Sequence, residues 1–227
     1  MPYVIAIDGP AGAGKSTVAR RVAKKLNYMY LDTGAMYRSV AWKAHRKSVA
    51  ADDAAGLEEI ARGLSIRFSG LNDGDSQQVW VDGTDVTADI RTPEVSSMTS
   101  RISALPALRS VIVEQQRQMA ALEASRGVVL EGRDIGTVVF PDAQLKIFLT
   151  ASATERARRR VEEMWRRGIR VDSENTLAEL LERDDRDSTR AASPLAAAED
   201  AVHVDTDGMS IDEVVGRILE LWQERQA

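Results

Sequence analysis

Nine residues near the start of the chain have the types and spacing of a phosphate-binding loop. The segment reads Gly9-Pro10-Ala11-Gly12-Ala13-Gly14-Lys15-Ser16-Thr17 and matches G-x-x-x-x-G-K-[ST]. Glycines in such a loop let backbone amides approach phosphate oxygens, and the following helix adds the partial positive charge of its amino end. Lys15 is expected to reach the β- and γ-phosphates, and Ser16 to offer its hydroxyl to Mg²⁺. The loop therefore predicts binding of a nucleoside triphosphate.

The residues around this loop predict the elements that must position it. Pro2–Ile7 is an apolar run typical of a buried strand, and apolar residues recur after the loop with helical spacing. Further apolar runs predict four more strands, at 28–31, 128–130, 145–149 and 202–204. Helical patterns lie between them, and this alternation predicts an α/β fold with a five-stranded parallel sheet and helices on both faces.

Residues 64–89 interrupt this alternation. Leu64–Phe68 alternates with period two, Gly70–Ser76 is typical of a turn, and Gln78–Val81 resumes as a strand before the hairpin signal Asp82-Gly83. We expect a small antiparallel sheet here, inside an inserted region at 35–125. The core domain is then 1–34 and 126–227, with a short lid at about 153–172.

Local signals predict where several helices begin and end. Thr176 with Glu179, and Ser210 with Glu213, have the spacing of a capping box. Thr92-Pro93 and Leu105-Pro106 place proline where a first helical turn accepts it. Gly127 and Gly168 are expected to follow helix ends.

The composition limits the class of protein. A net charge of −5 argues against a dedicated nucleic-acid binder, and no apolar stretch has the length of a membrane span. The chain has no cysteine and only two histidines, which excludes disulfides and thiolate zinc sites and disfavours a histidine-based triad. We expect a monomeric cytoplasmic enzyme without a signal peptide and without an obligate protein partner.

Three motifs place arginines beside turn residues and carboxylates. They are Asp32-Thr33-Gly34-Ala35-Met36-Tyr37-Arg38, Glu131-Gly132-Arg133-Asp134 and Arg183-Asp184-Asp185-Arg186-Asp187-Ser188-Thr189-Arg190. The first two follow predicted strands, at the sheet edge where ligands bind. Guanidinium groups bind phosphate oxygens bidentately and stay charged, so the motifs favour transfer of a phosphoryl group between phosphates. Each motif also has a structural interpretation, as a helix cap, a loop with an ion pair and a solvated helix face, respectively.

Taken together with the loop, these motifs resemble bacterial cytidylate kinases, a family of P-loop nucleoside monophosphate kinases. The resemblance rests on Asp-[Ser/Thr]-Gly-Ala-x-Tyr-Arg, Gly-Arg-Asp-x-Gly-Thr-Val-Val-Phe-Pro and Arg-Asp-x-Arg-Asp-x-x-Arg, and it extends over essentially the whole chain. It implies transfer of the γ-phosphoryl group of ATP to CMP, and also to dCMP, with Mg²⁺ as cofactor.

The resemblance also implies roles for individual residues. Thr33, Arg38, Arg133 and Arg190 would hold the acceptor phosphate. Ser100, Arg109 and Asp134 would read the edge of the cytosine. Arg183 and Asp187 would contact the ribose. Residue 16 is Ser where many nucleoside monophosphate kinases have Gly, so its role toward magnesium follows from the general loop motif instead.

Seven arginines between 156 and 170 form a basic stretch interrupted by glutamates. Arg156 and Arg160 lie one helical turn apart on the same face. We interpret the stretch as a lid over the triphosphate, in which Arg156 and Arg160, with Lys15, Arg133 and Arg190, stabilise charge in the transition state. A solvated helix with internal ion pairs and an RNA-binding surface are the alternatives.

Two other functions stay open at this point. A kinase of the same fold could use AMP, UMP or a hydroxyl acceptor, and a hydroxyl would require a base such as Asp32 or Asp134. The second is a nucleotide-dependent switch or RNA-linked ATPase, which the net charge and the three motifs disfavour. An acceptor phosphate is already ionised and needs no general base, so catalysis would consist of positioning and charge neutralisation.

Overall fold

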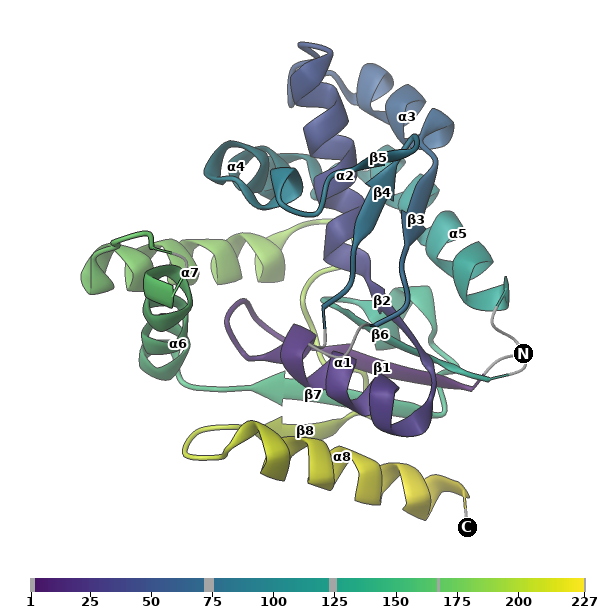
Figure 1. Cartoon of the computed structure of the whole chain (residues 1–227), viewed down its shortest axis with the longest axis vertical. Helices are drawn as coiled ribbons and strands as arrows, with labels where there is room; N and C mark the ends of the chain where they lie inside the picture. Colours follow the sequence, from purple (N-terminus) through teal and green to yellow (C-terminus); the bar gives the residue numbers. More distant parts are fainter. Residues whose placement is uncertain (1–2, 72–75, 123–125, 167, 227) are drawn as a thin grey trace. The chain divides into compact units, whose positions relative to one another are not determined.

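The computed structural model describes residues 3–71, 76–122, 126–166 and 168–226, and its main sheet has five strands (Figure 1). The strand order is β2-β6-β1-β7-β8. The strands are β1 (Val4–Asp8), β2 (Met29–Asp32), β6 (Val128–Gly132), β7 (Leu145–Thr150) and β8 (Val202–Asp205). All five residues of β1 are buried, as expected of a central strand covered on both faces. The predicted α/β fold with a five-stranded parallel sheet is confirmed.

A second, antiparallel sheet lies within residues 64–89, as predicted. It comprises β3 (Ile66–Phe68), β4 (Val79–Val81) and β5 (Thr84–Asp85), with β4 in the middle. Asp82 and Gly83 both have positive φ, 49° and 80°, which is the conformation of a two-residue type I′ hairpin turn. Part of the predicted turn at Gly70–Ser76 lies outside the described residues.

Helices connect these strands. They are α1 (Lys15–Leu26), α2 (Thr33–Arg46), α3 (Ala54–Gly63), α4 (Pro93–Ile102), α5 (Pro106–Leu122), α6 (Ala153–Arg166), α7 (Ser173–Thr189) and α8 (Ile211–Gln226). Two short turns add to them, the 3₁₀ turn η1 (Asp89–Arg91) and the π-helical turn η2 (Ile135–Val139). The turn η2 directly follows Arg133 and Asp134.

The chain divides into two units. One comprises Met1–Tyr3 and Ala23–Leu130, and the other comprises Val4–Val22 and Glu131–Ala227. The first contains the small sheet and α2 to α5, with a core that includes Leu57, Ile102 and Ile112. The second contains the phosphate-binding loop and α6 to α8, with a core that includes Ile5 and Ile147. The predicted boundaries of core, insertion and lid stay predictions.

Most helix-end signals are confirmed and one is wrong. Thr92 caps α4, α5 begins at Pro106, and Ser210 and Glu213 form the capping box of α8. Gly168 follows α6 with φ +77°. The predicted capping box at Thr176 is wrong because α7 begins three residues earlier, where the Asp172 side chain accepts the Asn175 amide. Gly127 also has positive φ, but residues 123–125 before it lie outside the described part.

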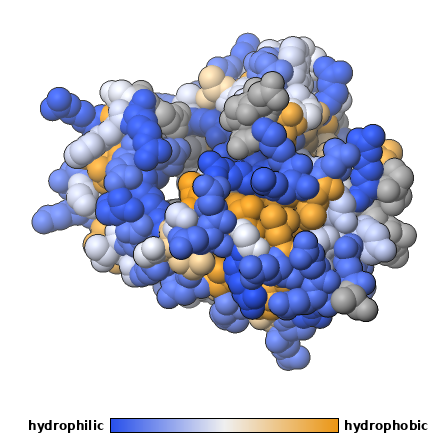
Figure 2. Space-filling model, turned by 60° about the horizontal axis from the view of Figure 1, so that its bottom comes forward, coloured by the Kyte–Doolittle hydropathy of each residue, from blue (hydrophilic) through white to orange (hydrophobic). Residues whose placement is uncertain are grey.

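Figure 2 shows one face of the molecule, on which hydrophilic residues surround a hydrophobic area. Six large apolar side chains of the described residues are exposed, including Trp165, Ile169 and Leu181. Among the described residues, no helix has both the length and the apolar character needed to span a bilayer.

Candidate active site

The phosphate-binding loop connects β1 to α1, as predicted. A Cβ at Gly9 would lie 2.0 Å from the carbonyl oxygen of Leu149 in β7, so no larger residue fits there. Gly12 and Gly14 have φ values of +78° and +88°, a conformation that glycine adopts without a steric penalty. These glycines allow the loop to follow a tight path that larger residues would obstruct.

Lys15, the first residue of α1, is buried and bends back to its own loop. Its Nζ donates to the Pro10 carbonyl oxygen at 2.6 Å. Burial, reinforced by the positive charge of Arg133, lowers the pKa of Lys15 to about 7. A nearby anion favours the charged form of an amine. Phosphate oxygens that approach Lys15 would therefore favour its charged form.

Ser16 is linked to a carboxylate to which the sequence interpretation gave no role. Its hydroxyl donates to Glu131 Oε1 at 2.5 Å, and Glu131 is buried near the carboxyl end of β6. Hydroxyl and carboxylate oxygens are the ligands that Mg²⁺ prefers. Glu131 could have been predicted from its position at the end of a strand. P-loop enzymes hold magnesium with the Ser or Thr of the loop and with a carboxylate from another strand.

Asp8 is a second buried carboxylate that the sequence interpretation did not single out. Its oxygens accept the amides of Ile135 at 2.9 Å and Gly136 at 2.7 Å, at the start of η2. Burial raises the pKa of Asp8 to about 6, although these two hydrogen bonds lower it, and nearby Asp134 raises it further. Asp8 thus connects β1 to the segment that carries Arg133 and Asp134.

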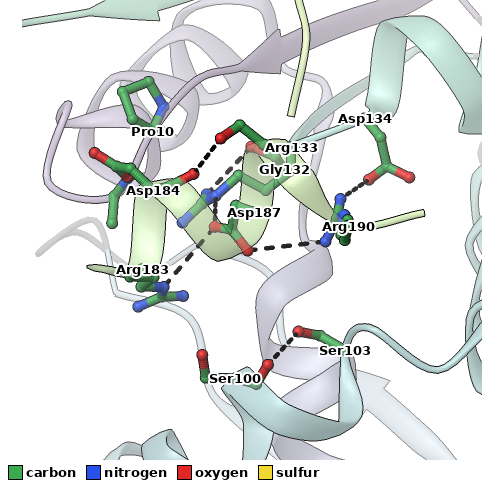
Figure 3. A network of polar contacts seen from close by, with 12 residues as sticks. Pro10, Ser100, Ser103, Gly132, Arg133, Asp134, Arg183, Asp184, Asp187 and Arg190 are labelled. Carbon is green, nitrogen blue, oxygen red and sulfur yellow. Dashed lines mark hydrogen bonds and ion pairs between the residues drawn. The ribbon is translucent and has the colours of Figure 1, made fainter. Parts of the chain in front are cut away.

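Asp187 lies at the centre of an arginine cluster (Figure 3). Arg133 follows β6, Arg183 lies in α7, and Arg190 directly follows α7. Its Oδ2 accepts Arg133 Nε at 2.9 Å, and Arg183 Nε and Arg190 Nη1 lie 4.0 and 3.9 Å from its carboxylate. Burial acts to raise the pKa of Asp187, but the attraction of these arginines outweighs it and lowers the pKa. The cluster carries three guanidinium charges around one carboxylate, which leaves an excess of positive charge for an anionic ligand.

Arg190 and Asp134 are brought together as well. Arg190 Nη2 lies 3.7 Å from Asp134 Oδ1, and both side chains are almost completely buried. Arg190 Nε also donates to the Ser193 carbonyl oxygen at 2.5 Å, beyond the end of α7. A residue predicted to hold phosphate therefore sits beside one predicted to read the base.

In the other unit, Thr33 and Arg38 lie on the first two turns of α2. The preceding Asp32 caps this helix by accepting the Ala35 amide at 2.8 Å. It also accepts Arg38 Nη2 at 2.9 Å, which fixes the guanidinium beside the helix start. Helix amino ends favour anions, so Thr33 and Arg38 lie where this unit is suited to bind one.

Ser100 and Arg109 lie on α4 and α5 of the same unit. Arg109 is buried, donates to the Ser103 carbonyl oxygen at 2.9 Å and has its guanidinium carbon 5.4 Å from the centre of the Tyr37 ring. The Ser103 hydroxyl donates to the Ser100 carbonyl oxygen at 3.3 Å (Figure 3). These contacts fix the Arg109 side chain in one orientation, as a residue that recognises a flat polar ligand requires.

The two arginines predicted to act from the lid differ in their surroundings. Arg156 is buried and donates to the Ala11 carbonyl oxygen of the loop, whereas Arg160 is exposed and pairs with Glu163 at 2.9 Å. Neighbouring Arg158 pairs with Glu155 and Glu162 on the helix surface. The stretch therefore contains both a solvated face with ion pairs and a buried contact with the loop.

The chain resembles characterised proteins over its whole length. A cytidylate kinase of Desulforamulus reducens is 54% identical over 221 residues, which cover 97% of this chain and 96% of that protein. A bifunctional pantoate ligase/cytidylate kinase of Synechococcus elongatus is 51% identical over 98% of this chain, which spans 42% of that longer protein. The crystal structure of TT1252 from Thermus thermophilus shares the fold, with a TM-score of 0.53, 19% identity and coverage of 100% of this chain and 98% of that one.

The model of one protein family, described as cytidylate kinase, matches residues 5–224. This range includes the phosphate-binding loop, the arginine cluster around Asp187, and the helices α6 and α7. From this match and the full-length relatives, we conclude that the chain belongs to the cytidylate kinase family.

Proposed function

We propose that this chain transfers the γ-phosphoryl group of ATP to CMP, giving ADP and CDP, and that dCMP is a second acceptor. Membership of the cytidylate kinase family supports the reaction. The observation that carries it in the structure is the cluster of Arg133, Arg183 and Arg190 around Asp187, within the unit that holds the phosphate-binding loop. Two substrates with several phosphates between them require such a concentration of positive charge.

On the donor side, the ATP phosphates are bound by the loop residues Gly9–Thr17, through backbone amides and the Lys15 ammonium group. Ser16 and Glu131 are the residues that would hold Mg²⁺, because their oxygens already converge. When bound, magnesium would neutralise charge on the β- and γ-phosphates. Within the described residues there is no group of three or more acidic, histidine or cysteine side chains suited to a metal. Magnesium in kinases typically uses one or two carboxylates together with substrate phosphates.

On the acceptor side, each set of residues has a separate task. Thr33, Arg38, Arg133 and Arg190 bind the CMP phosphate, Ser100, Arg109 and Asp134 recognise cytosine, and Arg183 and Asp187 bind the ribose. The lowered pKa of Asp187 keeps its carboxylate ionised at neutral pH, so that it accepts a hydrogen bond from a sugar hydroxyl.

The reaction needs no general base because a phosphate oxygen of CMP is the nucleophile. Lys15, Arg133, Arg190 and the lid residue Arg160 neutralise the charge that spreads over the transferred group. The alternative of a hydroxyl acceptor would require Asp32 or Asp134 as a base. Both carboxylates lie beside an arginine, Arg38 and Arg190 respectively, which places them as partners of the proposed phosphate-binding residues.

We further propose that the enzyme works as a monomer in the cytoplasm, without nucleic acid, a membrane or an obligate protein partner. Its net charge of −5 supports the absence of a nucleic-acid partner.

The test is a coupled ADP-release assay with ATP and magnesium, run in parallel with CMP, dCMP, UMP, AMP and no acceptor. Rapid turnover confined to CMP and dCMP is the expected result. Equal rates with AMP would contradict cytosine selectivity. Hydrolysis that is independent of any acceptor but stimulated by RNA would favour an RNA-linked ATPase instead.

A further inference from the structure

Both backbone polar groups of Ala11, in the middle of the phosphate-binding loop, are bound by side chains of α6 and α7. The Ala11 amide donates to Asp184 Oδ1 at 3.3 Å, and the Ala11 carbonyl oxygen accepts Arg156 Nη1 at 3.0 Å. Arg156 Nη1 also donates to Asp184 Oδ2, which closes a three-membered network. Arg156 Nε is bound as well, to the Ala151 carbonyl oxygen at 3.0 Å.

Apolar packing reinforces the same contact. Ala11, Ala157 of α6 and Leu180 of α7 form a buried cluster, against which Leu177 packs. A Cβ at Gly12 would lie 3.0 Å from Arg156 Cβ, so the first turn of α6 rests directly on the loop backbone. The loop is therefore held from outside by α6 and α7, through an ion pair and through a small apolar core.

This contact bears on the loop conformation that ATP binding requires. Gly12 and Gly14 have positive φ, and glycine loses more conformational freedom on ordering than any other residue. Ala11 precedes both glycines and has its amide and carbonyl fixed by charged partners. Hydrogen bonds to charged groups are stronger than neutral ones. The network thus restricts the backbone at Ala11, directly before the glycines that give this part of the loop its conformational freedom.

We propose that Arg156 and Asp184 are positioning residues, which hold the phosphate-binding loop at Ala11 in the conformation that receives the ATP phosphates. Their action passes through the loop backbone and not through direct contact with ATP. This role replaces the expectation that Arg156 itself stabilises the transition state. From the proposed function it requires only that the loop binds ATP. Arg160, which is exposed one turn further along α6, keeps its proposed role toward the triphosphate.

The experiment compares Asp184→Asn, Arg156→Gln and the double variant with two matched controls. Asp185→Asn changes the adjacent carboxylate of α7, and Arg158→Gln changes an exposed arginine of α6 that pairs with Glu155 and Glu162 of the same helix. ATP·Mg affinity is measured by calorimetry, and kcat and KM are measured for both substrates. We expect the Kd and KM for ATP to rise about tenfold or more in both single variants, with KM for CMP within twofold of wild type. The Kd for ATP of the double variant should be no higher than that of the weaker-binding single variant, because both substitutions break the same network.

A spectroscopic signature separates positioning from general loss of stability. In wild type, the Ala11 amide proton, bound to a carboxylate, should resonate downfield, and Asp184→Asn should shift it upfield while the control Asp185→Asn does not. If Asp184→Asn melts far below wild type, Arg156→Lys provides the test, because it keeps the charge and should recover part of the ATP affinity lost in Arg156→Gln.

Several outcomes would overturn the proposal. One is an unchanged ATP affinity in Asp184→Asn, and another is additive losses in the double variant. A fall of kcat in Arg156→Gln without any effect of Asp184→Asn would indicate that Arg156 contacts ATP directly. Failure of the proposed function would appear as a wild-type protein without CMP-dependent turnover. The present proposal could still be tested in that case, because the ATP affinities of Asp184→Asn and Asp185→Asn can be compared without turnover.

Discussion

The hydroxyl of Ser16 lies 2.5 Å from Glu131 Oε1, and this hydrogen bond joins the first turn of α1 to the end of β6. The two residues are 115 positions apart in the chain. Both carry oxygen ligands suited to magnesium, and Glu131 is buried. The pair therefore holds two of the proposed metal ligands at hydrogen-bond distance from each other.

The first prediction concerns Glu131. Glu131→Gln keeps the size of the side chain but removes its charge, so it should lower kcat by about a hundredfold, as expected for the loss of one electrostatic stabiliser. It should also raise the magnesium concentration needed for half-maximal activity. Glu162→Gln, on the exposed face of α6, is the control. Wild-type kcat and wild-type magnesium dependence in Glu131→Gln would exclude a metal-binding role.

The second prediction uses the lowered pKa of Lys15. Without nucleotide its pKa is about 7, so at pH 8 most molecules carry a neutral Lys15. Bound phosphates restore the charge, and ATP binding at pH 8 should therefore take up close to one proton. Calorimetry in two buffers with different ionisation enthalpies measures this uptake. Lys15→Met should abolish it and lower turnover about a hundredfold or more. Equal proton uptake in the variant would assign the titration to another group.

The sequence predicted the parts of the site that are local in the chain. The glycine spacing of the loop, the strand before it and the helix after it depend on neighbouring residues, and all three are confirmed. The arginine motifs were visible for the same reason. Their roles stay predictions.

Contacts between distant segments could not be predicted in this way. Asp8, Glu131 and Asp184 act through partners 127, 115 and 173 positions away. Asp8 and Glu131 follow predicted strands and Asp184 stands in an arginine motif, but the neighbouring residues do not show which distant groups these carboxylates bind. Thr176 illustrates a local signal that was misleading. Its spacing to Glu179 fits a capping box, but Asp172, one turn earlier, caps the helix instead. The local signal was present, but a competing residue started the helix.

The third prediction concerns base recognition by Arg109. Its guanidinium is fixed by the Ser103 carbonyl oxygen and by the face of Tyr37. Arg109→Gln should therefore lower kcat/KM for CMP roughly 10- to 100-fold, the range expected for a lost hydrogen bond to a charged group. KM for ATP should stay unchanged. Arg101→Gln, an exposed position on α4, is the control. An equal loss for ATP and CMP, or a large drop in melting temperature, would indicate a structural role instead.

The fourth prediction is a pH dependence of stability caused by Asp8. Burial raises its pKa to about 6 in the folded state, above the ordinary value of 3.8. The folded protein therefore binds a proton more tightly than the unfolded chain, and the contribution of Asp8 to stability falls as pH rises from about 4 to just above 6. Between pH 5 and pH 7.5 this loss is on the order of 1 kcal/mol. Asp8→Asn removes the titration. Urea unfolding of both proteins should thus show the variant gaining stability relative to wild type over this range, and a constant difference would show that Asp8 does not titrate there.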